Sequence, residues 1–159
     1  MMLSILTTLL LWLHSLATVV LIGHYLLLAL VYLPALSSKE LGAAGTTFLS
    51  EISRRSRVWL YASLLIFIVT GVYLMLVDPN YLGFADFGNL WGVLMLVKHL
   101  LILGMIALGF WFNAVLRVGP MMRTNSGASQ ALERFRQQAQ WMAIAGVLVL
   151  LLTALAQAE

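Results

Sequence analysis

Three histidines and one lysine lie inside long apolar stretches of the sequence, where polar side chains are rare. Lys98 and His99 lie in the apolar run 90–116, and His14 and His24 lie in the first run. A charged side chain at the centre of a bilayer costs about 2.5–3.5 kcal/mol on insertion scales, so it is retained where it has a partner or a function. Imidazole binds transition metals and haem iron. These four residues are therefore the candidates for chemistry.

The stretches that carry these residues are long enough to cross a membrane. A bilayer core of about 30 Å needs about 20 helical residues. We predict such helices at roughly 5–33, 58–77, 91–117 and 131–157. With 62% hydrophobic and only 9% charged residues, and a mean hydropathy of +0.99, the composition excludes an ordinary soluble domain. We expect residues 1–159 to form a single all-α domain, a four-transmembrane-helix bundle.

Basic residues mark two of the three connections and predict the topology. They are Lys39, Arg54, Arg55 and Arg57 before the second helix, and Arg117, Arg123, Arg134 and Arg136 before the fourth. The connection 78–89 has no Lys or Arg. The positive-inside rule therefore places both basic loops in the cytoplasm and both termini outside. The net charge of +3 reflects this topology and contact with a lipid bilayer, not nucleic acid. We expect a multi-pass protein of the inner (plasma) membrane.

Local signals predict where the helices end. Leu33-Pro34 is expected to end the first helix, Asp78-Pro79-Asn80 the second and Gly119-Pro120 the third. The mixed polar and apolar spacing of 37–57 favours a separate short helix on the inner membrane surface.

Depth along the helices predicts which candidates can meet. His14 lies about ten residues from the outer end of the first helix, and His99 about eight from the outer end of the third. Both helices run inward, so the two side chains lie at similar depth and can ligate one metal ion or one haem iron. His24 lies roughly 15 Å deeper. It is the weaker candidate metal ligand and cannot share a metal with His14.

Lys98 points about 100° away from His99 around the same helix. It can be a counter-charge to a propionate or a bound anion, an axial ligand in place of His99, or a side chain that snorkels outward. Each histidine has packing as its alternative role, with a hydrogen bond to a carbonyl or hydroxyl. The sequence has no cysteine, which excludes thiolate metal sites and iron–sulfur clusters. Methionine thioethers with imidazole suit copper(I), although no Met-x-x-Met pair accompanies His14.

Several spacings carry a resemblance to a known family. His14 is followed nine residues later by Gly23, Lys98 is followed by Asn113 and then by Arg117 and Pro120, and the fourth helix continues through 146–154. In these features the chain resembles the CopD-type (copper resistance D) membrane family, which is distantly similar to the HemJ-type protoporphyrinogen oxidases. It departs from the family pattern at Leu21, where Trp is common, and at Met142, where an acidic residue often stands.

The resemblance implies one of two activities. CopD-type members imply copper handling at the inner membrane. HemJ-type members imply a bound haem b and oxidation of a porphyrinogen, with a histidine of the first helix and a lysine of the third as functional residues. Those positions correspond to His14 and Lys98 here. Neither His24 nor His99 is carried over from the family.

We therefore expect a membrane protein that binds haem b between the first and third helices. His14 and His99 are the expected axial ligands, and Lys98 is an alternative ligand or a charge partner. The expected role is electron transfer, alone, as a homo-oligomer or within a larger membrane redox complex. The alternatives are copper transport or homeostasis, a HemJ-like porphyrinogen oxidase (a membrane oxidoreductase), and a purely structural membrane subunit.

Overall fold

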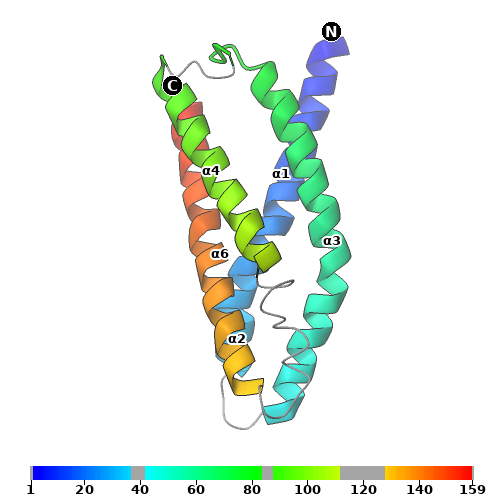
Figure 1. The fold of residues 1–159 in the computed structure, drawn as a ribbon. Helices are drawn as coiled ribbons and strands as arrows, with labels where there is room; N and C mark the ends of the chain where they lie inside the picture. Colours follow the sequence, from blue (N-terminus) through cyan, green and yellow to red (C-terminus); the bar gives the residue numbers. More distant parts are fainter. Residues whose placement is uncertain (1, 37–41, 84–87, 112–127, 159) are drawn as a thin grey trace.

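Four long helices stand side by side in the computed structural model (Figure 1), which describes residues 2–36, 42–83, 88–111 and 128–158. They are α1 (Met2–Leu27), α3 (Gly42–Leu76), α4 (Leu90–Phe110) and α6 (Ala128–Gln157). Each contains a segment long and apolar enough to cross a membrane: Ile5–Ala35, Arg54–Leu76, Leu90–Phe110 and Glu133–Gln157. The prediction of an all-α chain with four candidate membrane spans is confirmed.

Large apolar side chains cover the outside of the bundle, and alanines contribute to the contacts between its helices. Leu30, Val58 and Trp59 are each at least 70% exposed, as expected for side chains that contact lipid rather than water. The buried residues include several alanines: Ala17, Ala29, Ala139, Ala143 and Ala156. Small residues let helices approach closely in a bilayer, where packing rather than hydrophobicity drives association. The surface fits a lipid environment.

Helix α1 is the centre of the packing. It packs against α3 on one side and α6 on the other, and α4 packs against α6. A side chain at Gly146 would put its Cβ 3.0 Å from Ile22, and one at Gly109 would lie 3.3 Å from Met142. Glycine therefore favours the close approach of α6 to α1 and of α4 to α6, because any larger residue would push Ile22 or Met142 aside.

The first membrane helix does not end at Leu33-Pro34 as predicted. After α1 the chain makes a π-helical turn, η1 (Leu28–Tyr32), and continues as α2 (Leu33–Leu36). The Leu33 N–H donates to the Leu28 carbonyl, five residues back. Proline has no N–H and crowds the preceding turn, and a π turn is a known way to relieve that local mismatch. The proline therefore changes the helix without ending it.

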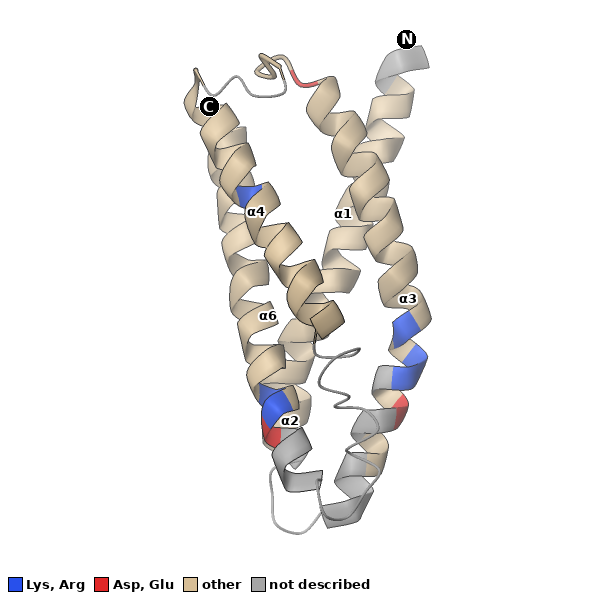
Figure 2. Cartoon of the chain, in the orientation of Figure 1, with Lys and Arg blue, Asp and Glu red and all other residues tan. Residues whose placement is uncertain are grey.

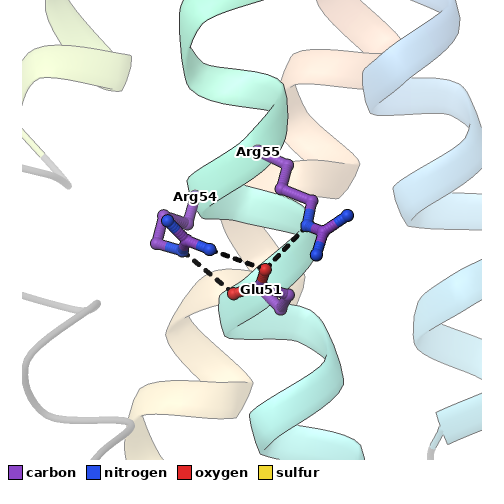
Figure 3. Close-up of polar contacts among 3 residues, drawn as sticks. All are labelled: Glu51, Arg54 and Arg55. Atoms are coloured by element: carbon purple, nitrogen blue, oxygen red, sulfur yellow. Dashed lines mark hydrogen bonds and ion pairs between the residues drawn. The ribbon is translucent and has the colours of Figure 1, made fainter.

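The separate surface helix predicted for 37–57 is also wrong in its described part, because α3 runs unbroken from Gly42 to Leu76. No Gly or Pro interrupts residues 46–70. Glu51 also supports the polar first turns through ion pairs with Arg54 and Arg55, each 2.7 Å long (Figure 3). Pairs spaced three and four residues apart stabilise a helix, so the polar segment continues directly into the membrane span.

The connection after α3 matches the predicted turn chemistry. The Asp78 carboxylate accepts a hydrogen bond from the Asn80 backbone N–H at 3.0 Å. Asn89 then caps α4, because its side-chain oxygen accepts from the Gly92 N–H at 2.7 Å. Such a cap satisfies one of the free N–H groups at a helix start.

Charge is distributed unequally along the bundle. Basic residues gather at one end (Figure 2), which we call the arginine end: Arg54, Arg55, Arg57, Arg134 and Arg136. Lys98 lies well away from it in α4. Lys39, Arg117, Arg123 and the predicted helix stop at Gly119-Pro120 lie outside the described residues.

Candidate functional site

His14 is held by a hydrogen bond to the neighbouring helix. Its Nδ1 lies 2.9 Å from the hydroxyl oxygen of Thr70 on α3. The Thr70 hydroxyl already donates to the Ile66 carbonyl at 2.6 Å, so toward His14 it accepts. His14 Nδ1 therefore carries the proton, and in the neutral ring Nε2 keeps its lone pair. This is the tautomer in which a histidine binds a metal through Nε2.

Helix α3 also shapes the slot in which the imidazole lies. The Phe67 ring stacks on His14 with centroids 4.5 Å apart and planes 21° from parallel. One turn further along α3, a Cβ at Gly71 would come within 3.1 Å of His14 Cε1. Because a contact that short forces a neighbour to move, Gly71 makes room for the ring. Three residues within little more than one turn of α3 thus fix the height, plane and tautomer of His14.

Lys98 shares this level of the bundle. It is half-buried on α4, and its ammonium lies near enough to interact electrostatically with His14. Within the described residues no carboxylate forms an ion pair with Lys98. A lysine at membrane depth is costly without a counter-charge or a polar partner. The site therefore joins one imidazole nitrogen with a free lone pair and one cation.

His99 makes its hydrogen bond within its own helix. Its Nδ1 lies 2.6 Å from the Met95 carbonyl, and because a carbonyl can only accept, Nδ1 is again the protonated nitrogen. His99 Nε2 therefore also keeps its lone pair in the neutral ring. Of the two neighbours on α4, Lys98 is the one that interacts electrostatically with His14. Within the described chain His14 and His99 make their hydrogen bonds to other groups, so their joint ligation of one iron stays a prediction.

His24 belongs to a different part of the bundle. It lines a cavity of about 450 Å³ between the four helices and makes an edge contact with the Tyr25 ring at 5.4 Å. Neither His14 nor Lys98 lines this cavity. The separation of His24 from His14 follows from their spacing along α1.

The described residues contain no group of three His, Cys, Asp or Glu side chains able to hold a metal ion by themselves. A haem iron needs less from the protein, because the macrocycle supplies its four equatorial nitrogens and the chain adds only axial ligands. The donor set at the His14 level therefore fits a haem better than a bare ion that depends on these residue types.

Sequence reasoning missed Thr70, Phe67 and Gly71 as partners of His14. They lie more than fifty residues along the chain, and only the rotation of α3 brings them to the imidazole. Comparison with protein families, with curated proteins and with solved structures finds no match to this chain.

Proposed function

We propose that this bundle binds haem b in the membrane and transfers electrons, with His14 as an axial ligand. The observation that carries the proposal is the hydrogen bond from His14 Nδ1 to Thr70, which fixes the tautomer and leaves Nε2 for iron. A histidine that binds a metal through one ring nitrogen usually donates a hydrogen bond from the other. Bound haem would supply reversible one-electron chemistry.

The chain's own residues have distinct parts in this proposal. Thr70 and Phe67 orient His14, and Gly71 leaves space for its ring. Lys98 is the second ligand or the partner of a haem propionate, because it lies within electrostatic reach of His14. His99 is the other candidate for the second axial position, with its Nε2 free of hydrogen bonds in the described chain.

The distribution of arginines supports an orientation. If the arginine end faces the cytoplasm, as the positive-inside rule predicts for an inner-membrane protein, His14 and Lys98 lie in the outer half of the bilayer. An electron partner, whether a second copy or a larger redox complex, would then reach the haem from the outer face or within the membrane.

The test is a reduced-minus-oxidised visible spectrum of the purified protein, with iron and copper analysis of the same sample. We expect a sharp alpha band and stoichiometric iron. His14→Ala should abolish both, whereas His24→Ala, on the same helix, should keep both. Full haem content in His14→Ala, or bound copper with a featureless spectrum, would refute the proposal; copper would favour a copper-handling protein.

A further inference from the structure

The cavity that contains His24 is a second site, separate from His14 and Lys98. Its volume of about 450 Å³ lies within the range of small-molecule sites. It starts at Phe67, which also stacks on His14, and it extends past Thr18 on α1 and Ile102 on α4 to Gln138 at the arginine end. All four long helices contribute to its wall.

The part of the cavity near the His14 level is apolar. Its wall there includes Leu21, Leu64, Phe67, Ile102 and Met105. From Phe67 to Arg57, both of which line the cavity, α3 advances ten residues, or roughly 15 Å. An elongated apolar space of this kind suits a hydrocarbon chain that lies along the helices.

Polar groups are concentrated toward the arginine end. His24, Tyr25, Tyr61 and Gln138 line the cavity there, and the Tyr25 and Tyr61 side chains lie near enough to interact electrostatically. No hydrogen bond within the described chain engages the polar side-chain atoms of these four residues, and each is open enough to accept a partner. These polar atoms are reached from the open part of the cavity, where Tyr61 is 61% exposed, and they are available to a ligand headgroup.

Arg57 gives the polar end its charge. Its neighbours Arg54 and Arg55 are both paired with Glu51 (Figure 3). Arg57 lines the cavity and makes no ion pair with any described carboxylate. Among the described residues that line the cavity there is no acidic side chain. A guanidinium presents two parallel N–H groups that match a carboxylate, so the favoured headgroup is an anion of that shape.

We propose that this cavity binds a single-chain amphiphile with a carboxylate headgroup, of the fatty-acid class. The carboxylate lies at Arg57, near Tyr25 and Tyr61, and the chain extends along α3 toward Phe67. The site requires no chemistry from His14, and it shares only Phe67 with the residues described around His14.

The experiment uses the full chain in nanodiscs of zwitterionic lipid, with a photoreactive diazirine derivative of dodecanoate as the probe. After illumination, labelled peptides are mapped by mass spectrometry. We expect labels within 60–67 and 102–110, removed by excess dodecanoate and not by dodecanol. Arg57→Gln should lower labelling about tenfold, the loss expected for a charge-assisted hydrogen bond.

Two variants complete the design. Arg54→Gln removes an arginine already paired with Glu51 and should leave labelling unchanged. Ile106→Trp fills the cavity and should prevent labelling without touching the arginine, and circular dichroism checks that each variant is folded. Equal loss in Arg54→Gln and Arg57→Gln, or equal competition by dodecanol, would overturn the carboxylate site. Competition by phosphatidylglycerol alone would instead assign the cavity to a two-chain lipid and overturn the proposal.

Discussion

The two polar levels inside the bundle differ in how their polar atoms are satisfied. At the His14 level the protein makes the hydrogen bonds itself, through Thr70 and the Ile66 carbonyl. At the arginine end, Tyr25, Tyr61 and Gln138 line open space and have no hydrogen bond within the described chain. The first level is organised before any ligand arrives, which suits a tightly held cofactor. The second leaves its polar atoms open to a ligand, which suits a molecule that enters and leaves.

Thr70→Val is expected to have the largest effect, because it removes the hydrogen bond that organises the His14 level. Valine has nearly the same shape but cannot accept a hydrogen bond, so His14 loses the partner that fixes its tautomer. Loss of such a partner lowers metal affinity by about 10–100-fold. Haem titration of the purified apoprotein, followed by the Soret band, measures the change.

Thr153→Val is the matched control. The Thr153 hydroxyl donates to the Val149 carbonyl of its own helix at 2.8 Å and contacts no histidine in the described chain. Its replacement should leave haem affinity within about twofold, the scale of a few tenths of a kcal/mol expected for a change away from the site. Equal losses in both variants would mean that Thr70 acts only through helix stability, and the comparison would fail.

Gly71→Ala should have a smaller effect at the same level. The new Cβ would lie 3.1 Å from His14 Cε1, so the ring must move by a few tenths of an ångström, and its stacking on Phe67 limits that movement. We expect haem affinity to fall severalfold and the midpoint potential to shift. A redox titration measures both.

Gly104→Ala serves as the control for helix propensity. A Cβ there has nothing within 4 Å, and Ala replaces Gly in a helix with a gain of up to about 1 kcal/mol. We expect unchanged haem affinity and equal or higher thermal stability. An unchanged Gly71→Ala protein would show that the slot around His14 has more freedom than its contacts indicate.

The four membrane helices could be predicted from the sequence because length and hydropathy determine them almost alone. Depth was also accessible, since residue number converts directly to height along a helix, and Lys98 does lie within electrostatic reach of His14. The rotation of each helix about its own axis could not be predicted. Apolar residues surround each helix in lipid, so no polar face marks which side of α3 meets His14, and nothing in the sequence marks Thr70 as its partner.

The end of the first helix and the cavity could not be predicted, for related reasons. Pro34 was read as a stop because the tolerance of a π turn depends on neighbouring helices, which the sequence does not show. The cavity depends on residues from all four helices, and its polar members lie far apart in the chain. Tyr25 and Tyr61 were visible as tyrosines in apolar runs, but their pairing required the register between α1 and α3.

The smallest expected effect concerns the ion pairs with Glu51, which Arg54 and Arg55 make and Arg57 does not. Hydrogen bonds from Arg54 and then Arg55 lower the pKa of the Glu51 carboxyl from 4.5 to about 2. Because the folded-state pKa is depressed, these ion pairs stabilise α3 above about pH 4.5 and lose that contribution as the pH falls toward 2. The site is exposed, so the effect on stability is small.

Titration of Glu51 by carboxyl-selective NMR should give a midpoint near pH 2, and Glu51→Gln should release Arg54 and Arg55 at neutral pH. If carboxylate binding still depends on Arg57 alone in the Glu51→Gln variant, the position of Arg57 on the cavity wall makes it the binding residue. If adding Arg54→Gln to that variant also weakens binding, the deciding property of Arg57 is that it is not paired with Glu51.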